Sequence, residues 1–319
     1  PPALRRRTFQ CHAWPEADFP ATRQTDGFTL DLFLQTLLNG LLIGGVIATF
    51  TIAFQLTFGV LHVIDFAVGG WVVLGGYLGY YMVTGLGLDG FVAIPVAFVL
   101  FGAIGYLIGP ILYNVRNSRT ARPELMALAL TFGLFTLLRG GMLTAWGFNT
   151  RTVATALSGE SLMVGPVTVP LIRVAAALFA AVIAGGLFIF LYRTRYGLAI
   201  RATAENRHNA ALMGVNIHRL SANVYGLYAG ITAMAGVLMG AIYSVNPESG
   251  LRYTLFAFFV AVLAGLGSVG GAVVAALMLG VIEAYVATYV GSSYSLLAIF
   301  TTLFLVLLIS PRGILRRGL

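Results

Sequence analysis

The stretch GAVVAALMLGVIEAYVATYV, residues 271–290, contains one charged side chain in twenty residues. An α-helix needs about 20 predominantly apolar residues to cross ~30 Å of hydrocarbon, so this stretch is long enough to span a membrane. Windows of the same kind recur along most of the chain. The sequence therefore predicts a polytopic membrane protein of the all-α class, built as a helical bundle.

The composition of the whole chain supports this class. Of 319 residues, 59% are hydrophobic and only 9% are charged, with a mean hydropathy of +0.91. A soluble domain carries roughly 25% charged residues, and too little polar sequence remains here to cover a soluble core. About 8–10 transmembrane helices are expected, near 32–58, 66–86, 91–113, 125–147, 167–191, 222–243, 254–268, 271–290 and 295–309.

Two regions differ in composition from these spans. Residues 1–31 are polar and contain prolines, and they lack an apolar stretch directly after the Arg5–Arg7 cluster. They are expected to form a poorly ordered tail rather than a cleaved signal peptide. Residues 32–319 are expected to form one transmembrane domain, which contains a polar segment at 193–221.

The residue types present exclude several kinds of chemistry. All nineteen basic residues are arginine, so the chain has neither a P-loop lysine nor a Schiff-base lysine. Cys11 is the single cysteine, and the four histidines show no spacing typical of a metal site. No catalytic residue, metal or cofactor is therefore expected, and the chain is predicted not to be an enzyme.

The arginines indicate an orientation in the membrane. They cluster at 116–122, 193–219 and 312–317, which fall on one side of the predicted bundle. The positive-inside rule places these segments and the C-terminus in the cytoplasm, with 148–166 and 244–253 outside. The same rule explains the net charge of +8 without a nucleic-acid partner.

Three ionisable side chains fall inside or at the ends of predicted spans. A charge at mid-membrane costs on the order of 3 kcal/mol, so such groups usually find a partner or face a pathway. Arg139 and Glu283 are predicted either to pair with each other or to line the pathway. Asp65 is predicted to be a helix cap or a pathway residue. Asn39, beside Gly40 in the first span, is a further pathway candidate.

The segment RATAENRHNAALMGVN, residues 201–216, is too polar to span the membrane and too rich in alanine for a disordered linker. It predicts a short amphipathic helix from about 198 to 213, which Gly214 ends. Two positions for this helix remain open: on the lipid surface, or docked against a partner protein.

Two segments of the chain are similar to each other: VGGWVVLGGYLG at 68–79 resembles VGGAVVAALMLG at 269–280. Duplicated units are common in membrane transporters. Glycine-rich spans also match by chance, so two explanations of the similarity stay open: an internal repeat and coincidence.

Seven short motifs occur in order along the chain: NGLLIG at 39–44, TFGL at 131–134 through Trp146-Gly147, RATAENRHNAALMGVN at 201–216, AMAGVL at 233–238, GLGSVGGA at 265–272, LGVIEA at 279–284 and PRGIL at 311–315. This ordered set resembles the LivH-like permeases of branched-chain amino-acid ABC transporters, over about residues 32–316. The chain departs from the family in one place: it reads DFAVGG at 65–70 where the family usually has Asn-Phe-Ala-His-Gly-Glu.

This resemblance implies a function and a set of partners. The chain would be the permease subunit of an ABC importer in a bacterial inner membrane, forming the path for hydrophobic, branched-chain amino acids. Its implied partners are two cytoplasmic ATP-binding subunits, a LivM-like second permease or another copy of itself, a periplasmic or lipid-anchored substrate-binding protein, and the lipid bilayer.

The resemblance also assigns a role to the polar segment. Residues 201–216 would be the coupling helix in a cleft of the ATPase, with charge-assisted bonds from Arg201, Glu205 and Arg207 and a turn at Gly214.

Other functions remain as alternatives. A permease of the same superfamily could carry urea or short amides. An ion-coupled secondary transporter could use Asp65, Arg139 and Glu283 as its charged path. A channel or a membrane enzyme is a further alternative, although no catalytic grouping of residues supports an enzyme.

Overall fold

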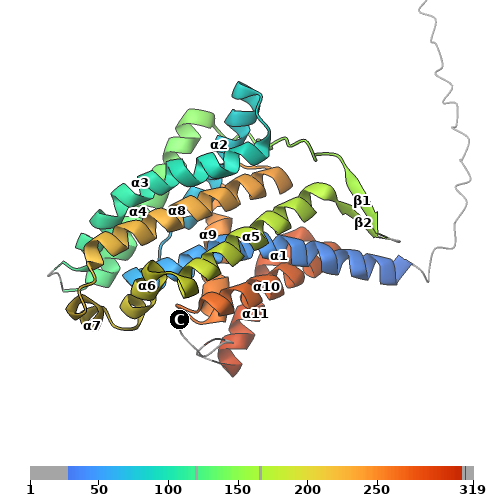
Figure 1. The fold of residues 1–319 in the computed structure, drawn as a ribbon. Helices are drawn as coiled ribbons and strands as arrows, with labels where there is room; N and C mark the ends of the chain where they lie inside the picture. Colours follow the sequence, from blue (N-terminus) through green and yellow to red (C-terminus); the bar gives the residue numbers. More distant parts are fainter. Residues whose placement is uncertain (1–27, 119–120, 165–166, 311–312, 314–319) are drawn as a thin grey trace, which may run out of the picture.

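The computed structural model describes residues 28–118, 121–164, 167–310 and 313. Most of the tail expected over 1–31 lies outside these residues, as do Arg312, Arg316 and Arg317. The described chain is a bundle of helices with one small hairpin (Figure 1). Its apolar helices are α1 (Phe28–Leu61), α2 (Val68–Leu86), α3 (Ala93–Arg116), α4 (Pro123–Trp146), α5 (Leu171–Arg193), α8 (Ile217–Ile242), α9 (Ser249–Ala264), α10 (Val269–Tyr289) and α11 (Ser295–Ile309).

The remaining elements are short. Helices α6 (Arg195–Glu205) and α7 (Arg207–Leu212) follow α5, and the antiparallel hairpin of β1 (Ser161–Val164) and β2 (Val167–Pro170) precedes it. Single 3-10 turns, η1 (Gly90–Val92) and η2 (Ser292–Tyr294), lead into α3 and α11.

The all-α membrane class is confirmed. Within the described chain, seven helical segments are long and apolar enough to cross a membrane, and they contain α1, α3, α4, α5, α8, α10 and α11. Helices α2, of 19 residues, and α9, of 16 residues, are not among these seven and complete the nine expected segments. The span expected at 254–268 is misplaced by about five residues, because Gly265, with φ +89°, ends α9 after Ala264.

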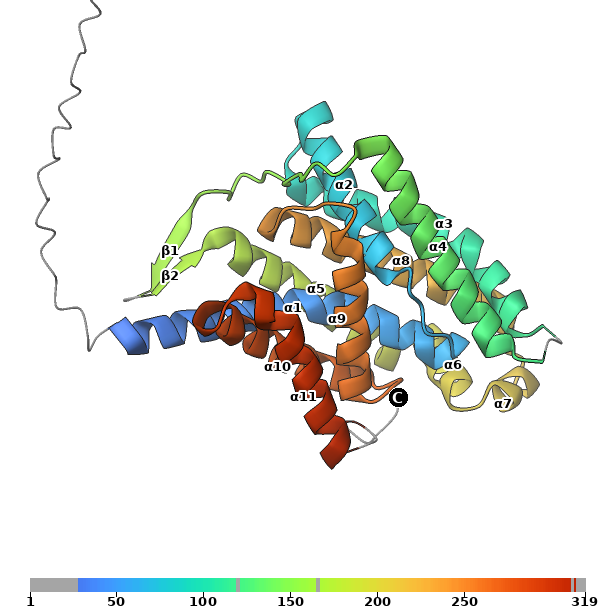
Figure 2. The ribbon, with the colours of Figure 1, turned by 180° about the vertical axis from the view of Figure 1, so that it is seen from behind.

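The α3–α4 connection and the α6–α7 segment, which hold two of the three arginine clusters, lie at the same end of the bundle (Figures 1 and 2). The arginines of the third cluster, at 312–317, lie outside the described residues. At the basic end formed by the first two clusters, Arg116 at the close of α3 pairs with Glu124 at the start of α4, with a nitrogen to oxygen distance of 2.7 Å. The hairpin lies at the opposite end, where the Gln35 side chain donates a hydrogen bond to the Thr168 carbonyl. The two ends therefore differ in charge and in structure.

The buried core centres on α1, α2 and α8, and α8 is buried along most of its length. Helices α1–α4 and helices α8–α11 form two sets of four with the same pattern of contacts. Helix α1 packs along α10, and α3 packs along α8. The first helix of each set thus lies against the third helix of the other set. The sequence similarity between 68–79 and 269–280 would instead align α2 with α10, so it does not follow this pattern.

Glycines allow the central helices to touch through their backbones. A Cβ atom built on Gly236 of α8 would lie 1.9 Å from the Val72 carbonyl oxygen of α2. One built on Gly75 of α2 would lie 2.1 Å from the Ala233 oxygen of α8. Small residues serve this purpose in membranes, where no hydrophobic force drives helices together. The α2–α8 contact therefore depends on these two positions.

Replacing Gly236 by alanine should lower the apparent Tm of the purified chain in detergent. The added methyl group meets backbone that cannot move aside, and overpacking of this kind costs about 1–3 kcal/mol. Gly133→Ala is the matched control, since a Cβ there meets nothing within 4 Å, and alanine stabilises a helix by roughly 0.5–1 kcal/mol over glycine. Equal Tm values for the two variants would contradict the close α2–α8 contact.

Candidate functional site

The chain leaves helical geometry between α1 and α2. Residues 62–67 link the two helices, and His62 is the one non-glycine residue of the described chain with a positive φ, at +52°. Asp65 is 1% exposed, and its carboxylate accepts a hydrogen bond of 2.7 Å from the Ala67 N–H. Asp65 therefore closes a turn just before α2 begins at Val68 but is not the N-cap of this helix. The N-cap is Ala67, which makes no side-chain cap hydrogen bond, so the capping alternative is wrong.

The first turns of α2 and α9 lie against each other. The Thr254 hydroxyl of α9 accepts a hydrogen bond from the Gly69 N–H and donates one to the Phe66 carbonyl, each at 3.1 Å. Gly69 and Gly250 touch through their backbones, since a Cβ on Gly69 would lie 1.8 Å from the Gly250 oxygen. Thr254 thus satisfies one backbone group within the break and one in the first turn of α2.

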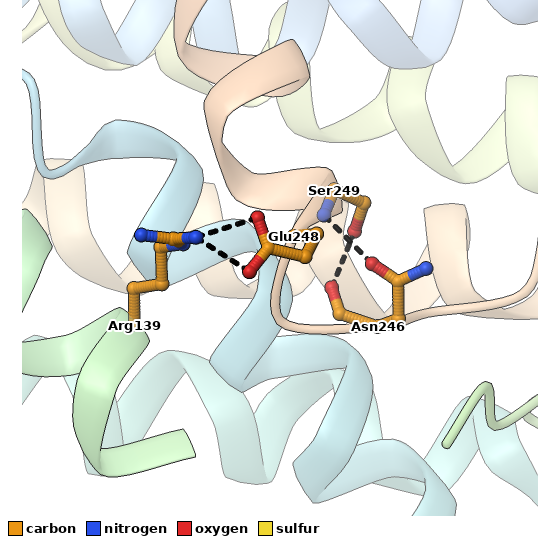
Figure 3. A network of polar contacts seen from close by, with 4 residues as sticks. All are labelled: Arg139, Asn246, Glu248 and Ser249. Atoms are coloured by element: carbon orange, nitrogen blue, oxygen red, sulfur yellow. Dashed lines mark hydrogen bonds and ion pairs between the residues drawn. The ribbon is translucent and has the colours of Figure 1, made fainter. Parts of the chain in front are cut away.

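An ion pair holds the segment that precedes α9 (Figure 3). Arg139 of α4 contacts both carboxylate oxygens of Glu248, at 2.6 and 2.7 Å. Two residues earlier, the Asn246 side chain accepts a hydrogen bond from the Ser249 N–H at 2.8 Å. The Ser249 hydroxyl donates to the Asn246 carbonyl at 2.7 Å. These contacts fix the start of α9 against α4.

The predicted pairing of Arg139 with Glu283 is wrong. Glu283 of α10 accepts a hydrogen bond of 2.5 Å from Arg252 of α9, and its side chain is 13% exposed. The two charges lie in different parts of the bundle, because α4 packs on α2 and α3 whereas α10 packs on α1, α9 and α11. Both true partners, Glu248 and Arg252, fall in 244–253, which the sequence assigns to an outer loop.

The Arg252–Glu283 pair lines two adjoining cavities of about 260 and 300 Å³. Tyr243 and Ile43 belong to the walls of both. The larger cavity also borders Asn39, whereas Asp65 and Arg139 line neither. Of the four pathway candidates, the fold therefore brings Asn39 and Glu283 to one cavity. Asp65 lies instead in the break before α2, and Arg139 contacts the segment before α9.

The polar segment forms two helices rather than the single helix expected over 198–213. Asn206 separates α6 from α7, and its side chain caps α7 by accepting a hydrogen bond from the Asn209 N–H. Asparagine favours such capping over helix interiors, which is the signal that the sequence prediction missed. Gly214, with φ +88°, follows the last turn of α7 as expected.

The three charged residues of this segment have different surroundings. Arg201 stacks over the Tyr192 ring at 4.7 Å, and Arg207 donates hydrogen bonds to the Val60 carbonyl in the last turn of α1. Glu205 is exposed, beside a shallow hollow that His62 also lines. Burial, and next the Arg207 charge, lower the pKa of His62. The segment is thus tied to α1 by Arg207 and open to partners at Glu205.

The end of α7 exposes apolar side chains. Leu212 and Met213 are 74% and 86% exposed. Leu212 is the last residue of α7, and Met213 follows it, at the basic end of the bundle (Figure 1). Glu205, the last residue of α6, is exposed as well.

No group of histidine, cysteine and acidic side chains that could hold a metal ion occurs in the described ranges. The polar residues instead form ion pairs, caps and cavity walls. Cavity walls that carry charged and amide side chains can hold a polar solute.

The chain matches known permeases over most of its length. The family model described as the permease component of branched-chain amino acid transport systems matches residues 36–309. The high-affinity branched-chain amino acid transport system permease protein BraD of Pseudomonas aeruginosa is 31% identical over 300 residues, covering 89% of this chain and 96% of BraD. LivH of Escherichia coli K12 is 32% identical over 301 residues, with the same coverage of both chains.

A more distant similarity extends to another kind of permease. The ribose import permease protein RbsC of Escherichia coli K12 is 28% identical over 216 residues, covering 65% of this chain and 62% of RbsC. The match to BraD and LivH is therefore both closer and more complete than the match to RbsC.

A double-mutant cycle should separate the observed ion pairs from the predicted one. Arg139→Gln and Glu248→Gln should show a coupling of at least about 0.5 kcal/mol in unfolding experiments, because their side chains are in contact. Arg139→Gln and Glu283→Gln serve as the control and should be additive. Coupling between Arg139 and Glu283 with none between Arg139 and Glu248 would contradict the contacts of Figure 3.

Proposed function

The chain belongs to the family of permease components of branched-chain amino acid transport systems, and from this membership we propose that it is the transmembrane subunit of an ABC importer. Its cargo is hydrophobic, branched-chain amino acids. The observation that carries the proposal is the match to BraD and LivH, which covers 89% of this chain and 96% of each of these permeases.

The proposed subunit performs no covalent chemistry. Two cytoplasmic ATP-binding subunits supply the free energy at the basic end of the bundle. A second permease, LivM-like or another copy of this chain, completes the pathway. A periplasmic or lipid-anchored substrate-binding protein delivers the amino acid at the hairpin end. This arrangement places the chain in a bacterial inner membrane with its C-terminus in the cytoplasm.

The polar segment is the proposed contact with the ATPase. Glu205, Leu212 and Met213 are exposed and able to enter a cleft on a partner. Arg207 links the same segment to the last turn of α1 through the Val60 carbonyl. Movement of α7 by an ATPase is therefore passed to α1 and to the 62–67 link, which leads into α2. This chain of contacts supports a role in alternating access.

The four pathway candidates divide into two roles in this proposal. Asn39 and Glu283 line the cavities and are the residues that meet the cargo. Asp65 closes the turn before α2, and Arg139 holds the segment before α9. The latter two position the broken helices and do not contact the cargo.

The proposal is tested by reconstituting the chain in proteoliposomes with its ATP-binding, permease and substrate-binding partners. Leucine uptake should require ATP and all partners. Uptake driven by an ion gradient without ATPase subunits would favour the secondary transporter, and flux through the chain alone would indicate a channel. Uptake of urea or short amides without leucine uptake would correct the cargo.

Reversing the charge of Glu205 should uncouple the importer. Glu205→Arg places a cation on the exposed edge of the polar segment, so substrate-stimulated ATP hydrolysis should be lost while membrane insertion stays normal. Glu205→Asp is the matched control, because it keeps the negative charge at the same site and should retain the stimulation. Normal stimulation in Glu205→Arg would reject the docking assignment.

Arg207 should act differently from Glu205. Arg207→Met removes the bonds to the Val60 carbonyl, so ATPase subunits should still copurify with the permease while leucine uptake falls about tenfold or more, as charge-assisted bonds are worth ~1.5–3 kcal/mol. Arg195→Met, at an exposed arginine of α6, is the control. Loss of copurification in Arg207→Met would mean that Arg207 contacts the ATPase itself.

A further inference from the structure

Three charged side chains from three helices border the larger of the two cavities. Arg173 comes from α5, Arg252 from α9 and Glu283 from α10. Arg252 and Glu283 pair at 2.5 Å, whereas Arg173 makes no ion pair with any described residue. The cavity therefore carries one positive charge in excess, and a carboxylate is the group that would balance it.

The same cavity contains polar atoms without hydrogen-bond partners. The Asn39 side-chain oxygen and the Ser295 hydroxyl oxygen are both buried and unpartnered within the described chain. Ser295 as a whole is 2% exposed. A buried polar atom without a partner costs free energy, so these atoms favour a ligand that supplies the missing bonds. The Asn39 oxygen can only accept, and it therefore favours a donor such as an ammonium group.

The adjoining cavity has an apolar wall. Ile43, Ile47, Met239 and Phe256 line it, beside the shared Arg252–Glu283 pair. With volumes of about 260 and 300 Å³, the two cavities lie at the small end of the range for small-molecule sites, roughly 300–1,000 Å³. The charged groups and the apolar wall are thus side by side in a space suited to a small amphipathic solute.

We propose that these adjoining cavities form a binding site that selects the charged head group of a free α-amino acid. The carboxylate is held by Arg173 and Arg252, the ammonium group by Glu283 and Asn39, and the aliphatic side chain by the wall around Ile43 and Phe256. This inference rests on the proposed function, to which it adds the groups of the cargo that the permease itself recognises.

The site discriminates among the solutes that related permeases carry. Urea, short amides and sugars have no charge, so they leave Arg173 without a counter-ion and offer Glu283 only neutral hydrogen-bond donors. An α-amino acid satisfies both at once, and hydrogen bonds to charged groups are about twice as strong as those between neutral groups. Selection therefore occurs inside the membrane subunit as well as in any protein that delivers the cargo.

The experiment uses the full-length chain in lipid nanodiscs, with no partner subunits, and measures saturation transfer from protein to ligand by NMR. L-leucine is compared with leucinamide, which lacks the carboxylate, and with 4-methylpentanoate, which lacks the ammonium group. We expect leucine to bind about tenfold more tightly than either analogue. Equal binding of all three would overturn the proposal.

Substitutions at the two cavities test whether the difference in ligand binding arises there. Arg173→Gln should weaken leucine binding to the level of leucinamide, and Glu283→Gln to the level of 4-methylpentanoate. Glu124→Gln is the control, since it removes an ion-paired glutamate far from the cavities, at the basic end. Glu283→Gln leaves Arg252 without its partner and can unfold the chain, whereas Arg173→Gln breaks no ion pair and keeps the test decisive.

The failure of this inference differs from the failure of the proposed function. If leucine binding is unchanged in Arg173→Gln while the complete importer still takes up leucine, the head-group site is wrong and the function stands. If the complete importer takes up no hydrophobic amino acid, the proposed function fails, and the inference fails with it.

Discussion

A buried backbone group without a hydrogen-bond partner costs free energy, and the structure depends on how it meets this constraint at two breaks between helices. Before α2, the Asp65 carboxylate and the Thr254 hydroxyl satisfy N–H and carbonyl groups of residues 66–69. Before α9, the Asn246 side chain accepts a hydrogen bond from the Ser249 N–H, and the Ser249 hydroxyl donates one to the Asn246 carbonyl. An acidic residue precedes each of these helices, where it complements the positive end of the helix dipole.

These two breaks connect the halves of the bundle. Because Thr254 of α9 bonds to the backbone of α2, neither helix can shift along its axis without the other. The glycine contacts between α2 and α8 extend the same rigid centre. The cavities at Glu283 and the polar segment at α7 are both attached to this centre through α1, which reaches from Asn39 at the cavity to Val60 at Arg207. One helix thus links the place where cargo would bind to the place where force would be applied.

The sequence predicts the membrane class, the nine apolar segments and the gathering of two basic loops at one end, since these follow from hydropathy and charge along the chain. It also predicts the stop at Gly214. The sequence does not predict which charged side chains pair. Arg139 and Glu283 are matched only because both lie near the middle of a predicted span and carry opposite charges. Their observed partners, Glu248 and Arg252, lie in a segment that is predicted to be a loop. The cavity is equally hidden: Arg173, Asn39 and Ser295 come from three distant helical segments, and no local pattern brings them together.

The absence of lysine has a consequence for these interior charges. A guanidinium keeps its proton at every physiological pH, whereas an ammonium group can lose its proton when buried. The positive partners of Glu248 and Glu283 are therefore permanent charges, and each of these carboxylates has a fixed counter-ion in the fold.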